Sequence, residues 1–250
     1  MIKRITEFSE SEWINTSDLE KKSGLTIPPY LESYCLILHP IYLNKRAETE
    51  PRIPWAEMTR EERISTAKID SPRPIQGNRI KWKQLAEENE LIFHPGINIS
   101  SLLDVSLDGL YPLRFYGPKE GTLDEPTCKE LIRLLKPYTG NQTCYFEYFV
   151  LATREIESDH LYSGELEDIV QLLNMDAVRG SPTYWWTQDH SWCLCSPYDD
   201  MVTILGGSQK LIDRVLLSDE LETLKVDLSL DWRQDKINEK QFEKLKKRRR

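Results

Sequence analysis

Two short apolar runs separated by a five-residue turn constrain the fold more than any other segment. Trp192-Cys193-Leu194-Cys195 and Met201-Val202-Thr203-Ile204-Leu205 flank the segment Ser196-Pro197-Tyr198-Asp199-Asp200. Serine, proline and aspartate are typical turn residues, and the flanking runs have the length and composition of strands. We therefore predict a β-hairpin over residues 192–205.

A glycine pair and a serine follow this hairpin directly. We expect Gly206-Gly207 to break the second strand and Ser208 to cap a helix over 210–217. The free N–H groups at a helix start favour an anion, which makes Gly206, Gly207 and Ser208 candidate ligand-binding residues. The segment lacks the lysine and long glycine loop of a P-loop and has no complete dinucleotide fingerprint. A strand-to-helix turn with a serine cap is the favoured interpretation.

Other segments have helix or strand patterns of their own. A helix is predicted to begin at Thr122 or Asp124, to continue through Pro126 and the apolar residues of 131–135, and to end at Pro137. The aromatic run 144–151 predicts a central strand. Residues 30–38 fit a helix and a strand equally well. Shorter elements are expected at 82–89 (helix), 102–107 (helix), 160–162 (strand) and 165–173 (helix), with a weak amphipathic helix over 1–25 in which Trp13 and Leu19 face inward.

These elements predict an α+β fold, with an antiparallel or mixed sheet and helices packed around it. The chain forms one compact unit or two lobes. We expect an α-rich N-terminal lobe over 1–120 with a long loop at about 44–80. Short helical turns are expected within this loop at 55–58 and 60–67, and its residues 70–78 are expected to be exposed. A C-terminal α+β lobe over 121–232 and a basic helical tail over 233–250 complete the prediction.

The composition of the chain limits the cellular compartment and the kinds of partner that we expect. The 250 residues include 33 basic and 41 acidic side chains, a formal net charge of -8, so the body is not expected to attract nucleic acid. No segment approaches the roughly 18 apolar residues of a membrane span, and no signal-peptide pattern follows the first residues. Five cysteines without a disulfide framework are expected to be free and mostly buried. The sequence therefore predicts a cytoplasmic protein.

The basic end of the chain is an exception to the acidic composition. Lys244 to Arg250 holds six basic residues in seven, and such a run could contact RNA, a membrane surface or an acidic protein. A solvated, fraying helix end explains the same residues and is favoured.

Aromatic and ionisable residues cluster before the hairpin. Trp185, Trp186 and Trp192 could line a pocket that stacks a ring, and Asp189, His190 and Asp199 could supply a His–Asp general base. A buried hydrophobic plate explains the tryptophans equally well and is the favoured interpretation. These three polar residues are the candidate catalytic residues.

Metal chemistry has little support in the sequence. Cys193 and Cys195 share one face of the predicted strand, but a closed zinc site needs about four ligands, and His190 is the only imidazole nearby. We predict no metal and no cofactor. No Gly-x-Ser-x-Gly nucleophile elbow occurs in the chain.

The pattern Trp185-Trp186-x-x-Asp189-x-x-Trp192-Cys193, followed by Asp199, Thr203 and Gly206-Gly207-Ser208, resembles a signature of a family of uncharacterised bacterial proteins. The resemblance extends over roughly residues 25–228. It implies no established activity. His190 stands where that family has arginine, Thr187 where it has proline, and Cys195 has no cysteine counterpart.

Two classes of function follow from these observations. The favoured hypothesis is a non-enzymatic protein-interaction module, immunity-like in its negative charge and abundant tryptophan. The alternative is a small-molecule-binding protein or hydrolase with a Trp-lined pocket that uses Asp189, His190 and Asp199.

Overall fold

The computed structural model describes residues 2–14, 27–69, 78–154, 159–227 and 235–248, and divides the chain into two compact units. Unit 1 comprises residues 1–39 and 119–231, and unit 2 comprises residues 40–118 and 232–250. The chain passes from one unit to the other after residues 39, 118 and 231, whereas one N-terminal lobe over 1–120 and a separate tail over 233–250 were expected. Residues 1–39 belong with the second half of the chain because the strands Lys3–Ile5 and Ser33–Leu38 pair with strands from that half.

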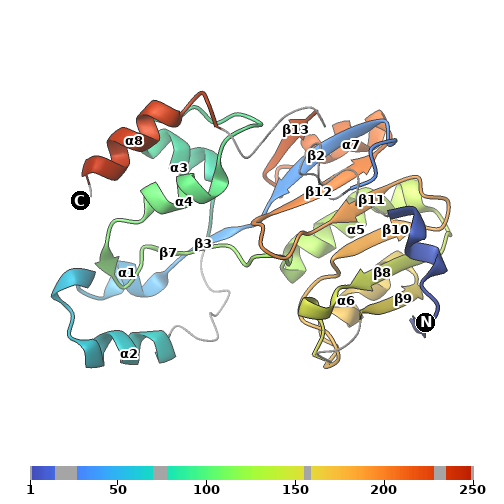
Figure 1. The fold of residues 1–250 in the computed structure, drawn as a ribbon, viewed down its shortest axis with the longest axis horizontal. Helices are drawn as coiled ribbons and strands as arrows, with labels where there is room; N and C mark the ends of the chain where they lie inside the picture. The colour runs from blue at the N-terminus through green and yellow to red at the C-terminus, as the bar shows by residue number, and fades with distance from the viewer. Residues whose placement is uncertain (1, 15–26, 70–77, 155–158, 228–234, 249–250) are drawn as a thin grey trace. The chain divides into compact units, whose positions relative to one another are not determined.

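Unit 1 is built on an eight-stranded sheet in which neighbouring strands are antiparallel (Figure 1). In sheet order the strands are β1 (Lys3–Ile5), β9 (His160–Gly164), β8 (Cys144–Tyr148), β10 (Tyr184–Thr187), β11 (Cys193–Cys195), β12 (Val202–Gly207), β2 (Ser33–Leu38) and β13 (Thr223–Val226). The α+β prediction is confirmed. Within the uncertain segment at 30–38, residues Ser33–Leu38 form strand β2, which is paired on both sides and buried at every position.

Helices cover one face of this sheet. They are α5 (Glu125–Thr139), η4 (Leu166–Asp168), α6 (Ile169–Leu172) and α7 (Gln209–Leu216). Their apolar side chains form one core with the strand residues that point the same way, including Phe146, Trp185 and Leu205. Full burial of a side chain as large as Trp185 contributes roughly 2–3 kcal/mol to folding.

Local signals predicted where two of these helices begin, although α5 continues past its expected end at Pro137 to Thr139. Asp124 caps α5 by accepting a hydrogen bond from the Thr127 amide, and Ser208 caps α7 by accepting one from the Leu211 amide. The hairpin formed by β11 and β12 is confirmed. Gly206 and Gly207 do not break the second strand, because they are its last two residues and pair with Tyr34 and Ser33 of β2.

The opposite face of the sheet meets the N-terminal segment, drawn in dark blue in Figure 1. A helix over 1–25 was expected, but the structure has a short strand, β1, and a 3-10 helix, η1 (Ser9–Ile14). The side chain of Trp13 in η1 packs edge-on against Trp186 of β10. Leu19, which was expected to face inward from the same helix, lies outside the described residues.

Unit 2 combines short strands with helices. The strands form the sheets β5-β3-β7 and β4-β6, with β3 (Ile41–Leu43), β4 (Ile53–Pro54), β5 (Arg79–Ile80), β6 (Leu110–Tyr111) and β7 (Phe115–Tyr116). The helices are α1 (Lys45–Thr49), η2 (Trp55–Glu57), α2 (Arg60–Ile69), α3 (Trp82–Glu88), α4 (Ile99–Ser106) and α8 (Glu239–Arg248). The expected long loop at 44–80 therefore contains three helical segments, and residues 70–77 of it lie outside the described part.

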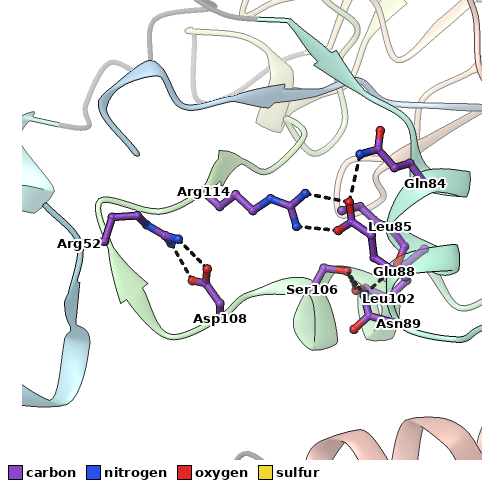
Figure 2. Close-up of polar contacts among 9 residues, drawn as sticks. All are labelled: Arg52, Gln84, Leu85, Glu88, Asn89, Leu102, Ser106, Asp108 and Arg114. Atoms are coloured by element: carbon purple, nitrogen blue, oxygen red, sulfur yellow. Dashed lines mark hydrogen bonds and ion pairs between the residues drawn. The ribbon is translucent and has the colours of Figure 1, made fainter. Parts of the chain in front are cut away.

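Ion pairs hold the irregular segments of unit 2 in place. Figure 2 shows Arg114 reaching the carboxylate of Glu88 with two hydrogen bonds of 2.6 and 2.8 Å. Arg52 binds Asp108 in the same two-pronged manner, at 2.7 Å for each bond. These arginines are thus engaged by acidic side chains of their own unit.

Among the described helices of both units, none is long and apolar enough for a bilayer crossing.

Candidate functional site

The polar residues singled out by the sequence do not meet in one place. Asp189 and His190 lie in the turn from β10 to β11, whereas Asp199 lies in the turn from β11 to β12. Consecutive turns of an antiparallel meander lie at opposite ends of the strand they share. The structure therefore separates Asp199 from the other two residues by the length of β11.

Hydrogen bonds from its own turn and from Gln142 engage Asp189. One carboxylate oxygen accepts from the Ser191 amide at 3.0 Å, and the other accepts from the Gln142 side chain at 2.7 Å. Partial burial raises the pKa of Asp189, but hydrogen bonds from Ser191, Thr187 and Gln142 outweigh it and hold the pKa below its usual value. A carboxylate stabilised in this way is a weak general base.

His190 is engaged by an aromatic ring. Its imidazole stacks on the indole of Trp13, with ring centroids 3.9 Å apart and an interplanar angle of 8°. The residue has a left-handed backbone with φ of 57°. No hydrogen bond joins it to Asp189 among the contacts of the described residues, so the expected His–Asp pair does not form here.

The three tryptophans of the signature are all completely buried. Trp192 donates a hydrogen bond from Nε1 to Thr139 of α5 at 3.1 Å, and Trp186 stacks on Tyr145 of β8 with centroids 5.5 Å apart. Within the described residues, Nε1 of Trp185 and of Trp186 has no hydrogen-bond partner. None of these rings offers an open face to a ligand, and the arrangement is that of the hydrophobic plate.

The start of α7 already holds an anion of the protein itself. The Gln209 amide donates to the carboxylate of Glu32 at 3.0 Å, while Ser208 accepts from Leu211. A Cβ at Gly206 would lie 2.6 Å from the side chain of Leu31, so this glycine is required by close packing. Glu32 thus occupies the position that an external anion would take beside Gly206, Gly207 and Ser208.

Cys193 and Cys195 are free, buried thiols on one face of β11. Burial raises the pKa of Cys193 well above its usual value, and a thiol of that kind is unreactive. Across the described segments, no group of three or more His, Cys, Asp and Glu side chains is arranged to hold a metal ion.

A buried chain of polar groups that the sequence did not reveal lies on the helix-covered face of the sheet. His39 Nδ1 lies 2.6 Å from the Lys119 carbonyl oxygen, and His39 Nε2 lies 2.9 Å from Thr203 Oγ1, which is 2.7 Å from Ser196 Oγ. A carbonyl only accepts, so Nδ1 carries the proton and Nε2 accepts from Thr203, which in turn accepts from Ser196. Burial lowers the pKa of His39 to about 4, so this neutral form persists at physiological pH. The three side chains are fully buried, which gives them a structural role in joining β2, β12 and β11.

The end of the sheet at which Asp199 lies is different, because large apolar side chains protrude there. Phe149, Leu151 and Tyr198 are 43%, 56% and 49% exposed. These three residues and the exposed acidic residues Glu120 and Asp199 are together called the exposed edge. Tyr198 and Asp199 follow β11, and Phe149 and Leu151 follow β8.

Hydrogen bonds of the backbone connect the loops that carry the exposed edge. Thr183, just before β10, accepts from the Ser196 amide through its carbonyl and from the Phe149 amide through its hydroxyl, at 2.8 and 3.2 Å. Gly121, next to Glu120, donates to the Asp200 carbonyl at 2.9 Å. The loops that carry Phe149, Tyr198 and Glu120 are therefore tied to one another.

Most of this surface was not predicted from the sequence. Residues 144–151 were expected to form one strand, but β8 ends at Tyr148 and the chain turns into η3 (Val150–Ala152). Phe149 consequently leaves the sheet and packs against Tyr184 while its ring stays partly open. Only Asp199 of the exposed edge had been proposed from the sequence.

Charge is divided unequally between the two units. Unit 1 carries 13 basic and 27 acidic residues, a formal net charge of -14, whereas unit 2 carries 20 basic and 14 acidic residues, a net charge of +6. The overall charge of -8 conceals this difference. The exposed edge therefore belongs to a strongly acidic body.

The chain was also compared with known proteins. No protein-family model, no curated protein and no solved structure matches it.

Proposed function

We propose that this chain is a non-enzymatic protein-interaction module that binds a cationic protein through the exposed edge. The role is immunity-like, in that binding neutralises the partner. The observation that carries the proposal is the group of three large, exposed apolar side chains, Phe149, Leu151 and Tyr198, at one end of an acidic unit.

The chemistry of the exposed edge is that of a protein contact. Aromatic side chains dominate binding energy at protein interfaces, and truncation of a central one typically costs about 2 kcal/mol or more. Tyr198 and Phe149 offer such rings on ordered loops, so little conformational entropy is lost when they bind.

The net charge of unit 1, more than the charges next to these rings, favours a cationic partner. Glu120 and Asp199 are exposed and have no ion pair within the described residues. The cations Lys119, Arg154 and Arg179 also lie nearby and are exposed, so the local surface is mixed. The net charge of -14 on unit 1 nevertheless favours encounter with a basic surface.

The enzymatic alternative has weaker support. Asp189 and His190 lie at the other end of β11 from Asp199, and the signature tryptophans are buried. A catalytic set requires its members within hydrogen-bonding reach of one substrate. The five free thiols fit a reducing compartment, so we place the interaction in the cytoplasm.

Quantitative affinity enrichment tests the proposal. The wild-type chain, E120K/D199K and the matched control E7K/D219K serve as baits in lysate of the native organism. Glu7 and Asp219 are exposed acids of unit 1 outside the exposed edge, so the control makes the same change in net charge. We expect one basic protein to be recovered stoichiometrically with the wild type and the control and to be lost with E120K/D199K. Equal recovery by all three baits, or no stoichiometric protein with any, contradicts the proposal.

A further inference from the structure

The basic C-terminal helix α8 is fixed to unit 2 by buried polar side chains. Asp235 accepts hydrogen bonds from His94, from the Asn98 amide and from Asn238. Asn238 in turn bonds both the amide and the carbonyl of Ile92, each at 2.9 Å. Buried groups with this many partners specify one geometry. The start of α8 is therefore held at a defined position on unit 2, which a fraying extension would not require.

The apolar side of α8 faces the protein. Phe242 is 5% exposed, Leu245 is half-buried, and the helix packs against α4. The outward side consequently consists of charged residues. An interfacial membrane helix needs the opposite arrangement, with its apolar side free to enter the lipid.

Four lysines of α8 are exposed and have no ion pair within the described residues: Lys240, Lys244, Lys246 and Lys247. Lys240, Lys244 and Lys247 are spaced by four and three residues, which places them along one stripe of the helix. Glu239 and Glu243 lie on the same helix but leave it with an excess of positive charge. The sequence continues this excess with Arg248, Arg249 and Arg250.

Three arginines of unit 2, unlike the lysines of α8, are already bound by acidic side chains. Arg46, Arg52 and Arg114 are each bound by a carboxylate through two hydrogen bonds, to Glu50, Asp108 and Glu88 respectively. Their charge is used within the protein. The lysines of α8 remain available for an external anion.

We propose that the lysine stripe of α8 binds the phosphate backbone of a nucleic acid without sequence preference. Neutralised phosphates release counterions, so such binding weakens steeply with salt. The net charge of +6 on unit 2 supports this site, although the whole chain is acidic. The inference is independent of the exposed edge, which lies in unit 1.

Fluorescence anisotropy with the full chain tests the proposal, with a labelled 20-nucleotide RNA and a 20-base-pair DNA duplex as probes. The test variants are K240E/K244E/K247E and the milder K240Q/K244Q/K247Q, which removes charge without adding acids near the helix end. The control, K45E/R60E/K81E, makes the same charge change at exposed helix starts of unit 2, where acids are tolerated. Circular dichroism confirms that each variant is folded.

We expect the wild type to bind at least one probe, and both α8 variants to weaken binding tenfold or more. The slope of log affinity against log salt should fall by about two to three, because each lost phosphate contact removes about 0.7–0.9. The control should retain most of the affinity. No binding by the wild type, an equal loss in the control, or binding only to phosphatidylserine vesicles overturns the proposal. Salt-sensitive association of the chain with itself instead of with the probes also overturns it.

Discussion

The indole of Trp13 and the imidazole of His190 stack at 3.9 Å, and this contact joins the N-terminal segment to the turn between β10 and β11. Trp13 also packs edge-on against Trp186 of the sheet. His190 adopts a left-handed backbone conformation, which costs a non-glycine residue about 1 kcal/mol. The ring contact with Trp13 therefore offsets the conformational cost of a non-glycine residue at position 190.

Two substitutions separate the stack from the backbone strain. H190A loses the ring contact and keeps the strain, so we expect it to lower the free energy of unfolding by about 1 kcal/mol. H190G loses the same contact but relieves the strain, so its stability should be close to that of the wild type. Urea denaturation measures both values. Equal destabilisation by the two variants would show that the left-handed conformation carries no cost here.

Glu147 gives the protein a component of stability that decreases as the pH rises. It lies in β8 and is buried; burial, and then the charge of Asp159, raise its pKa to about 7. In the unfolded chain this carboxyl releases its proton near pH 4.5. Between pH 4.5 and 7 the native state therefore binds more protons than the unfolded state, and the free energy of unfolding decreases as the pH rises through this range. We expect E147Q to match the wild type near pH 4 and to exceed it at pH 8 by up to roughly 3 kcal/mol. A stability difference that does not change with pH argues against this account, and E12Q, at an exposed site, serves as the control.

His39 contributes a component of the opposite sign. Its pKa falls from 6.5 when unfolded to about 4 in the buried chain with Thr203 and Ser196. Between pH 6.5 and 4 the unfolded state binds more protons, so the stability that the neutral histidine provides is lost as the pH falls. The contributions of His39 and Glu147 thus offset each other between pH 4.5 and 6.5. We expect H39Q to expose the falling slope of Glu147 in a pH series of urea denaturations, and E147Q to expose the rising slope of His39. Identical slopes in the two variants contradict the assignment.

Two glycines with a positive φ should differ in their tolerance of alanine. Gly121 and Gly140 have φ of 64° and 59°. A Cβ at Gly121 would lie 2.6 Å from the Tyr198 carbonyl oxygen, whereas a Cβ at Gly140 would meet nothing within 4 Å. We expect G140A, which meets backbone strain alone, to cost about 1–3 kcal/mol, and G121A to cost clearly more, since it also displaces the loop of the exposed edge. Comparable losses of unfolding free energy would contradict the close approach.

Local chemistry made part of the fold predictable from the sequence. The hairpin of β11 and β12, the serine cap of α7 and the aspartate cap of α5 each depend on residues within a few positions of one another. Turn residues, caps and apolar periodicity act over this range, so a single sequence shows them.

Long-range pairing was not predictable in the same way. β2 lies between β12 and β13, whose residues are more than 160 positions away, and Glu32 caps a helix that begins at Gln209. The candidate site failed for a related reason. Asp189, His190 and Asp199 are close in sequence, but the strand between them places them at opposite ends.

The exposed edge was not predicted, because its apolar residues have the composition of a strand. Phe149 and Leu151 continue the apolar run of β8, and their pattern alone is that of further strand residues. Their exposure depends on where the neighbouring strands end, which is a property of the assembled sheet.

Site-specific photocrosslinking in cells of the native organism tests the central claim most directly. A photoreactive phenylalanine analogue replaces Tyr198 in one variant and Leu217, an 82% exposed residue at the end of α7, in the control. We predict that position 198 crosslinks to one basic protein and that E120K/D199K in the same chain abolishes the product, while position 217 yields none. Crosslinks of equal yield at both positions, or none at position 198, would contradict the assignment of the exposed edge as a protein-binding surface.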